Sequence, residues 1–226
     1  MPKFSLLILC AGMGTRMLDL TKNTPKPLLQ FNDKVLLDNT INFFRDIGCN
    51  EFFINTHYLH YKIENYINKN FNNILINLIY EPLILGTGGG VRNIFNYTKN
   101  ENICVVNSDI FWKKNNKLDI KNFLKDYKDI THCKVLLSKK NNFLGLKNEK
   151  GDFTIENGNV LNLMEKKEAF FYSGLQIVSK KIFDKKNKIF PINQIWSNLI
   201  IEKNLRGSLL NSNILHVGDK SSFDAL

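Results

Sequence analysis

The segment from Leu9 to Leu28 concentrates residue types that can bind a polyphosphate. An apolar run ends at Cys10 and leads into a loop of small residues, Ala11, Gly12, Gly14 and Thr15. A loop of this kind after a strand exposes several backbone N–H groups in one direction, and such groups bind anions. Arg16 follows the loop, and Lys26 stands between Pro25 and Pro27, which stiffen its backbone. Two cations beside an anion-binding loop favour a polyphosphate ligand over a single carboxylate.

Two better-known glycine-rich loops do not fit this segment. A dinucleotide fingerprint would need glycine at position 17, which is Met17, and the Gly-Lys-Ser/Thr ending of a P-loop is absent. The glycines alone remain compatible with a turn from strand to helix in which they only relieve strain. Arg16 and the Pro-Lys-Pro element favour the anion-binding interpretation.

Size and composition indicate a soluble α/β protein of the cytoplasm. The chain has 226 residues, 43% of them hydrophobic, which suits one large domain or two small ones. No apolar run reaches the roughly 18 to 20 residues of a membrane span, and no signal peptide is evident. The four cysteines are scattered without a C-x-x-C pair, so we expect no zinc site, and this cysteine usage fits a reducing cytoplasm.

The formal net charge of +10 invites a nucleic-acid interpretation. The lysines are dispersed along a sequence rich in Lys, Asn and Ile, and they do not gather in one dense stripe. We therefore expect no nucleic-acid partner and no membrane partner, and a mild attraction of anionic substrates instead.

Strand-like and helix-like patterns alternate in the first half of the chain. This alternation predicts βαβ units and a Rossmann-like, mostly parallel mixed sheet flanked by helices. Shorter β segments after residue 131 predict a small antiparallel appendage, and the last two are expected to pair with each other. The expected strands are 4–10, 51–55, 74–80, 102–107, 133–137, 143–146, 152–155, 160–164, 169–178, 207–210 and 214–217, and the expected helices are 36–47, 63–71, one after Thr87, 120–127, 179–183 and 192–204.

Ligands of an open α/β sheet bind beyond the carboxyl ends of its strands. Polar or glycine-rich residues stand at four such ends: the Gly12 loop, Asn55 to His57, Glu81 with the loop Gly86 to Gly90, and Asn107 to Asp109. Their convergence predicts one crevice. His57 is as compatible with a structural role as with ligand contact.

Asp109 is a candidate anchor for Mg²⁺, which prefers oxygen ligands and retains waters. A helix-capping role is the alternative for a single aspartate, but bound phosphates would supply the remaining metal ligands.

The glycine loop, represented by Gly86, Thr87 and Gly88, would let backbone approach a base or a sugar closely. Glu165, Ser173 and Gly174 are candidate contacts of a second substrate on the sugar side.

Several segments together resemble the sugar-1-phosphate nucleotidylyltransferases. The run from Leu9 to Met17 is similar to their L-A-A-G-x-G-[ST]-R-[LM] signature, and Thr24 to Leu28 matches T-P-K-P-L. The further resemblances are Gly86 to Gly89 with the base and sugar loop, Asn107-Ser108-Asp109 with N-G-D, and Tyr172-Ser173-Gly174 with a sugar-side segment.

The resemblance implies one domain over residues 1–226, with a nucleotide-binding half (1–130) and a sugar-binding half (131–226). It implies the nucleotide-diphospho-sugar transferase type of fold, Mg²⁺ as cofactor, and the substrates NTP and sugar 1-phosphate. The compact branch containing N-acetylmuramate-1-phosphate uridylyltransferase is the nearest match, which suggests UTP and a role in peptidoglycan recycling. His216 stands where that branch has a second metal-binding Asp, and Asp219 replaces a Thr, so both are candidate metal ligands.

The reaction implied by the resemblance assigns a role to each group. The Gly12–Thr15 loop and Arg16 would hold the β and γ phosphates, Lys26 the α-phosphate, and Asp109 the metal, while Asn107 would contact the nucleotide. Guanylyl transfer to mannose or heptose 1-phosphate, cytidylyl transfer to phosphocholine, and a non-catalytic nucleotide-sugar-binding regulator remain alternatives. The sequence predicts no oligomeric state.

Overall fold

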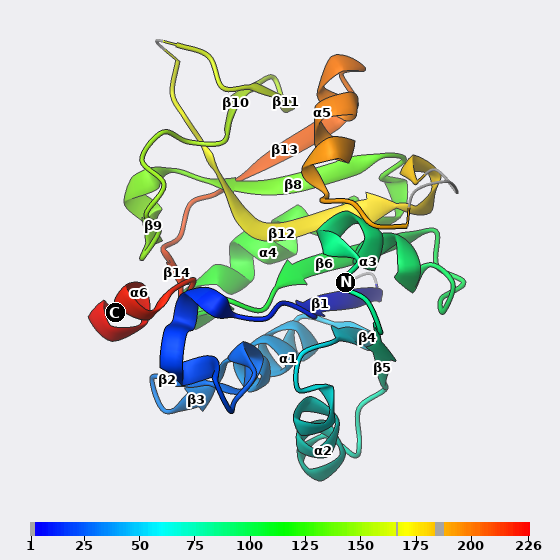
Figure 1. The fold of residues 1–226 in the computed structure, drawn as a ribbon. Helices are drawn as coiled ribbons and strands as arrows, with labels where there is room; N and C mark the ends of the chain where they lie inside the picture. The colour runs from blue at the N-terminus through cyan, green and yellow to red at the C-terminus, as the bar shows by residue number, and fades with distance from the viewer. Residues whose placement is uncertain (1–2, 166, 184–187) are drawn as a thin grey trace.

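The fold is a three-layer α/β arrangement in which helices cover both faces of a long mixed sheet (Figure 1). The structure, a computed structural model, describes residues 3–165, 167–183 and 188–226. The main sheet has the strand order β10-β11-β13-β8-β12-β6-β1-β4-β5. Its strands are β1 (Phe4–Cys10), β4 (Cys49–Thr56), β5 (Ile76–Tyr80), β6 (Asn102–Asn107), β8 (Cys133–Ser138), β10 (Phe153–Glu156), β11 (Asn159–Asn162), β12 (Phe171–Ser179) and β13 (Leu205–Leu210).

Four neighbouring strands, β6, β1, β4 and β5, are parallel, so their carboxyl ends meet at one edge. β12 runs antiparallel to both β6 and β8, β13 is parallel to β8, and β10 and β11 form an antiparallel hairpin at the far end. The predicted α/β class with an antiparallel appendage is confirmed.

Alternate residues of β1 face opposite helical layers, as the two-residue period of a strand requires. Leu6 and Ile8 belong to the core shared with α1, α2 and α4, whereas Leu7 packs with α3 and α5. Burial of both faces explains why the parallel strands are apolar without alternation in the sequence. The helices are α1 (Leu36–Asp46), α2 (His60–Asn70), α3 (Gly86–Ile94), α4 (Lys117–Phe123), α5 (Asn193–Ile201) and α6 (Lys220–Ala225).

A small separate core lies beneath the loop that follows β1. Buried Met17 packs there with residues of two small sheets: the hairpin of β2 (Gln30–Phe31) and β3 (Lys34–Val35), and the sheet of β7 (Ile110–Phe111), β14 (Ile214–His216) and β9 (Phe143–Leu144). Phe223 of α6 also packs against this core. The loop after β1 is therefore held from below by side chains from both ends of the chain.

Three predicted features differ from the structure. The last two β segments do not pair with each other, because β13 joins the main sheet beside β8 while β14 lies between β7 and β9. The helix expected over 120–127 ends at Phe123, and a 3₁₀ turn, Tyr127–Asp129, follows. The helix expected over 179–183 is a single 3₁₀ turn, Lys180–Ile182. Further 3₁₀ turns occur at Thr15–Thr21, Lys26–Leu28, Lys114–Asn116 and Lys140–Asn142.

Among the residues that the structure describes, no helix combines the length and apolar character needed to cross a membrane.

Candidate active site

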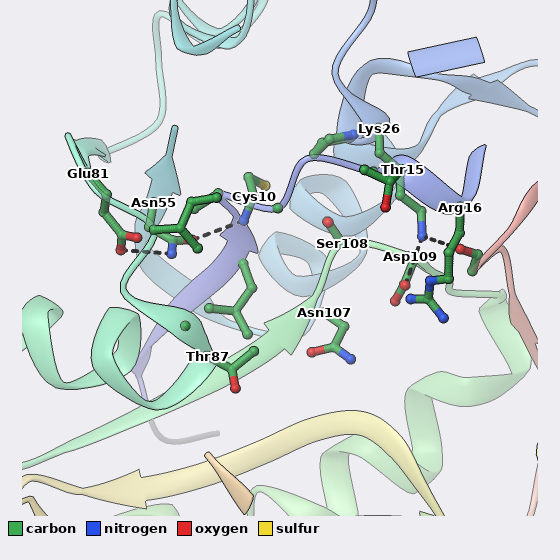
Figure 2. Close-up of a pocket in the computed structure, with 18 residues that line it drawn as sticks. Cys10, Thr15, Arg16, Lys26, Asn55, Glu81, Thr87, Asn107, Ser108 and Asp109 are labelled. Carbon is green, nitrogen blue, oxygen red and sulfur yellow. Dashed lines mark hydrogen bonds and ion pairs between the residues drawn. The ribbon is translucent and has the colours of Figure 1, made fainter. Parts of the chain in front are cut away.

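A cavity of about 370 Å³ opens at the carboxyl ends of β1, β4, β5 and β6 (Figure 2). The four strand ends that the sequence predicted to converge all reach it. Its lining comprises Leu9, Cys10, Ala11, Gly12, Gly14, Thr15, Arg16, Lys26, Pro27, Asn55, Glu81, Ile84, Gly86, Thr87, Asn107, Ser108, Asp109 and Gly218. Figure 2 shows Glu81 and Asn55 toward one end of this cavity, and Arg16, Lys26 and Asp109 toward the other.

The loop between β1 and the first 3₁₀ turn forms one wall of the cavity. Gly14 has a left-handed backbone (φ +67°), and a Cβ there would lie 3.0 Å from Thr21 Cγ2 and 3.2 Å from the Cβ of Lys26. The hydroxyl of Thr21 donates to the carbonyl of Gly14 at 3.0 Å, which fixes this turn. Gly12 faces open space, so a ligand can approach its backbone closely.

The side chain of Arg16 is exposed at the rim of the cavity and makes no hydrogen bond or ion pair with any other described residue. Its guanidinium is therefore available to an anion that enters the cavity. The backbone N–H groups at the start of the 3₁₀ turn Thr15–Thr21 have no partner inside that turn, which is the usual property of helix starts. Together, the loop and the arginine form a wall suited to binding an anion.

Lys26 and Asp109 form an ion pair in the cavity. Lys26 Nζ donates to Asp109 Oδ2 at 2.9 Å and to the carbonyl of Gly218 at 3.0 Å. Lys26 begins the 3₁₀ turn Lys26–Leu28, and Pro25 precedes it with an extended backbone. The two prolines thus fix the direction of a lysine that is almost completely buried. Two of its three N–H donors are used, and the third remains for a ligand.

The electrostatic environment keeps Asp109 ionised. Burial alone would raise the pKa of this carboxyl, but the adjacent charge of Lys26 and the imidazole of His216 lower the pKa well below its ordinary value. Its second oxygen, Oδ1, is buried without a hydrogen-bond partner among the described residues. A permanently ionised carboxylate with one unsatisfied oxygen fits the role of a metal anchor.

Within the described residues, no three His, Cys, Asp or Glu side chains gather closely enough to hold a metal ion. A metal at Asp109 would therefore complete its coordination with phosphate oxygens and water, which is the usual arrangement of Mg²⁺ in nucleotide enzymes.

Of the two further metal candidates, only His216 lies at the site. Its Nε2 atom is 3.6 Å from Asp109 Oδ2. Asp219 instead caps α6: its Oδ1 accepts from the backbone N–H of Ser222 at 2.9 Å and lies 3.2 Å from Lys147 Nζ. These contacts lower the pKa of Asp219 even though burial opposes the shift. The geometry therefore does not bring Asp219 to the metal anchor.

The other end of the cavity contains a buried polar network. Asn55 Oδ1 accepts from the backbone N–H of Cys10 at 2.9 Å, and Asn55 Nδ2 donates to Glu81 Oε1 at 2.9 Å. Burial raises the pKa of the Glu81 carboxyl, while the hydrogen bond from Asn55 opposes that shift. A carboxylate has about four acceptor positions, so Glu81 retains capacity for a ligand.

The glycine run is the first turn of α3 and is not an open loop. Gly86 and Thr87 line the cavity, but Gly88 is buried, and a Cβ there would lie 2.4 Å from the Phe190 ring. The N–H groups of Gly88 and Gly89 donate to the carbonyl of Phe190 at 3.0 and 3.1 Å. Gly88 is thus a packing residue, and those two amides are not available to a phosphate.

The sugar-side candidates do not line the cavity. Glu165 is exposed elsewhere, and the buried hydroxyl of Ser173 donates to the carbonyl of Leu136. Gly174 packs behind the site: a Cβ there would lie 2.7 Å from Ile110 Cγ1 and 3.4 Å from Asn107 Cβ. His57 is held by a 2.7 Å contact between Nδ1 and the Glu81 carbonyl, which supports its structural interpretation.

Several lining residues, Gly218 and Ser108 among them, carried no separate prediction. Gly218 supplies the carbonyl that orients Lys26, and Ser108 lines the cavity beside Asp109. Residues 26 and 218 are far apart in the sequence. Only the fold, which brings them together, reveals the contact between Gly218 and Lys26.

Comparisons with known proteins found a matching family model and several relatives. The family model described as "Nucleotidyl transferase" matches residues 5–190. A D-glycero-alpha-D-manno-heptose 1-phosphate guanylyltransferase of Campylobacter jejuni is 29% identical over 188 residues, which are 79% of this chain and 77% of that protein. The bifunctional protein GlmU of Methanococcus aeolicus is 30% identical over 219 residues, 91% of this chain but only 49% of the relative.

A solved structure has the same fold. HddC from Yersinia pseudotuberculosis complexed with GMP-PN superimposes with a TM-score of 0.79 at 21% sequence identity, covering 98% of this chain and 97% of that chain.

Proposed function

The chain belongs to the nucleotidyl transferase family, and from that membership we propose that it transfers a guanylyl group from GTP to a heptose or mannose 1-phosphate. The products are a nucleoside-diphosphate sugar and pyrophosphate. The observation that carries the proposal is the Lys26–Asp109 pair at one end of a cavity whose wall is an anion-binding loop. Uridylyl transfer to N-acetylmuramate 1-phosphate, expected from the sequence, has less support, because two of the relatives that match this chain are heptose-1-phosphate guanylyltransferases. Nothing in the comparisons supports peptidoglycan recycling.

The chemistry needs positioned charge more than a catalytic base. The second pKa of a phosphate monoester is near 6, so a sugar 1-phosphate is largely a dianion at neutral pH and attacks without proton removal. One of its oxygens forms a bond to the α-phosphorus of the NTP, and the bond to the bridging oxygen of the β-phosphate breaks. The electron pair leaves with pyrophosphate. Catalysis then depends on alignment and on stabilisation of the developing charge.

The residues of this chain divide those tasks. The loop from Gly12 to Thr15 and Arg16 bind the β and γ phosphates and hold the leaving group. Lys26 donates its remaining N–H to the α-phosphate, because its other two are held by Asp109 and Gly218. Asp109 would hold Mg²⁺, the expected ion, which would supply positive charge to neutralise the phosphates.

The base preference follows from Glu81. The Watson–Crick edge of guanine presents two adjacent donors, N1–H and the N2 amino group, to which a carboxylate is complementary. Uracil presents one donor between two carbonyl oxygens, which a carboxylate repels. Glu81 lines the cavity at the end away from Lys26, where Asn55 fixes its orientation. Gly86 and Thr87 line the same region and leave room for a flat base.

Cytidylyl transfer is the second candidate. A choline-phosphate cytidylyltransferase of Streptococcus pneumoniae is 45% identical, although over only 53 residues or 24% of this chain. A carboxylate also accepts from the N4 amino group of cytosine, so Glu81 alone does not exclude CTP.

The experiment that tests the proposal measures pyrophosphate release with each of the four NTPs and a panel of acceptors. The panel contains heptose 1-phosphate, mannose 1-phosphate, N-acetylmuramate 1-phosphate and phosphocholine. We expect the highest kcat/KM for GTP with one of the first two acceptors. Turnover with UTP or CTP in preference to GTP would refute the base assignment. Nucleotide binding without turnover on any acceptor would support the regulator instead.

A further inference from the structure

We propose that the active site binds a first-row transition ion such as Mn²⁺ or Co²⁺ more tightly than Mg²⁺, with Asp109 and His216 as its two protein ligands. The ion concerned is the metal of the proposed nucleotidyl transfer, so the inference rests on that function. The new element is a histidine nitrogen, the ligand atom that determines which metal ion is preferred.

His216 has an unused metal-binding nitrogen directed at the metal anchor. Its Nε2 lies 3.6 Å from Asp109 Oδ2, which is longer than a hydrogen bond. Its Nδ1 is buried without a hydrogen-bond partner among the described residues. Adjacent ligands of an octahedral ion are about 3.0 Å apart, since each lies about 2.1 Å from the ion at a right angle. The 3.6 Å separation places the imidazole beside the Asp109 carboxylate, so small side-chain rotations would bring Nε2 and the unpartnered Oδ1 onto one ion.

The surroundings of His216 hold the ring in this position. The residue pairs with Ile110 across β14 and β7, directly after Asp109, so the sheet fixes the two backbones relative to each other. The Phe143 ring contacts the imidazole edge to face, with centroids 5.8 Å apart. A Cβ at position 218 would lie 2.1 Å from Cε1 of the imidazole, so the ring occupies space that exists only because residue 218 is glycine. An imidazole packed in this way is preorganised as a ligand.

The donor set favours a transition ion. Mg²⁺ prefers oxygen atoms and accepts imidazole poorly, whereas affinity for nitrogen ligands rises from Mn²⁺ through Co²⁺ along the Irving–Williams series. Lys26 already contacts Oδ2 of Asp109, which leaves Oδ1 as the unsatisfied carboxylate oxygen. Among the described residues, no third His, Cys, Asp or Glu side chain joins Asp109 and His216. Phosphate oxygens of the nucleotide complete a mixed coordination sphere that suits Mn²⁺ and Co²⁺.

The test detects the nitrogen directly. Protein labelled with ¹⁵N at histidine is loaded with GTP and Mn²⁺, and electron spin echo spectroscopy records nuclei bound to the ion. We expect a ¹⁵N coupling in the wild type, which is distinguishable from the ¹⁴N of guanine, and its loss in His216→Ala. The matched control, His132→Ala, removes a histidine outside the cavity and should keep the coupling.

Competition titrations supply the second measurement. Loss of a partner that merely orients a ligand costs at least about tenfold in metal affinity, so removing a direct ligand should cost no less. We expect His216→Ala to weaken Mn²⁺ binding to the GTP complex at least that much while Mg²⁺ binding changes little. His216→Asp should shift the preference toward Mg²⁺. Binding of Mg²⁺ to this variant also shows that a substitution at position 216 leaves the protein folded.

The outcomes separate this inference from the proposed function. An absent ¹⁵N coupling, or equal Mn²⁺ to Mg²⁺ affinity ratios in wild type and His216→Ala, would overturn the inference even if GTP turnover is normal. A ¹⁵N coupling together with no turnover on any acceptor would refute the transferase function and leave the metal site standing.

Discussion

Lys26 Nζ and Asp109 Oδ2 lie 2.9 Å apart although 83 residues separate them in the sequence. The pair forms because the Pro-Lys-Pro turn and the end of β6 meet at the same edge of the sheet. The lysine charge holds Asp109 ionised for a metal, and the aspartate in turn holds the lysine in the cavity. The two charges that a phosphoryl transfer needs are therefore in place before any substrate binds.

Removing Lys26 should abolish most of the activity. Loss of a preorganised charge at the transition state typically costs about 100- to 1000-fold in rate. We expect Lys26→Ala to lower kcat by that factor, measured as pyrophosphate release at saturating GTP and acceptor. Asp109→Ala should give a loss of similar size.

The control for Lys26 is Lys22→Ala, which removes an exposed lysine of the same segment that does not line the cavity. Its turnover should remain close to that of the wild type. Urea unfolding of all three variants shows whether they remain folded. Normal turnover in Lys26→Ala would remove this residue from the mechanism.

Asp219 should matter for stability and not for catalysis. Its Oδ1 caps α6 through the N–H of Ser222, and removal of such a cap typically costs about 1 kcal/mol. We expect Asp219→Ala to lower the free energy of unfolding by about that amount, with little change in kcat or in the metal concentration required. Asp219→Asn, which keeps an acceptor oxygen, should cost less.

The cost of Asp219→Ala should depend on pH in a defined direction. The folded protein lowers the pKa of Asp219, so its contribution is fully present above the unfolded pKa of about 3.9. The contribution is lost as the pH falls below that value toward the lower folded pKa. Unfolding curves at pH 7 and near pH 3 check this, and a difference that grew on acidification would contradict the capping role.

How far the sequence predicts the structure depends on whether the signal is local. The bounds of β1 and β6 agree with the expected strands 4–10 and 102–107, since strands buried on both faces give apolar runs that end where the strand ends. The pairing of β13 and β14 was predicted wrongly because pairing is a non-local property. Two neighbouring β segments suggest a hairpin, but β13 pairs with β8, and β14 pairs with β7 and β9, all far away in the sequence.

The site shows the same distinction. Arg16, Lys26 and Asp109 could be predicted to share a cavity because each follows a recognisable strand or turn at the sheet edge. The cap of α6 by Asp219 and the packing of Gly88 against Phe190 depend on contacts that spacing does not encode. Sequence similarity identified position 216 as unusual, whereas only the structure shows that its ring faces Asp109.

Glu81 should determine the preference for guanine. A hydrogen bond to a charged group contributes about 1.5–3 kcal/mol, or about 10- to 100-fold in affinity. Wild-type enzyme should therefore prefer GTP over ITP, which lacks the N2 amino group, by roughly that factor. Glu81→Gln should reduce this preference, measured as the ratio of kcat/KM values. An unchanged ratio would show that Glu81 does not read the base.

Gly14 and Gly12 offer a matched pair of substitutions in the same loop. Alanine at position 14 would hold a left-handed backbone, which costs about 1–2 kcal/mol, and its Cβ would press on Thr21 and on Lys26. We expect Gly14→Ala to lower the free energy of unfolding by at least that amount and to reduce kcat, because the Cβ displaces Lys26 from the cavity. Gly12→Ala meets nothing within 4 Å and should leave stability unchanged. Urea unfolding and pyrophosphate release measure both effects. Equal stabilities of the two variants would mean that the turn at Gly14 is not the conformation that holds Lys26 in the active site.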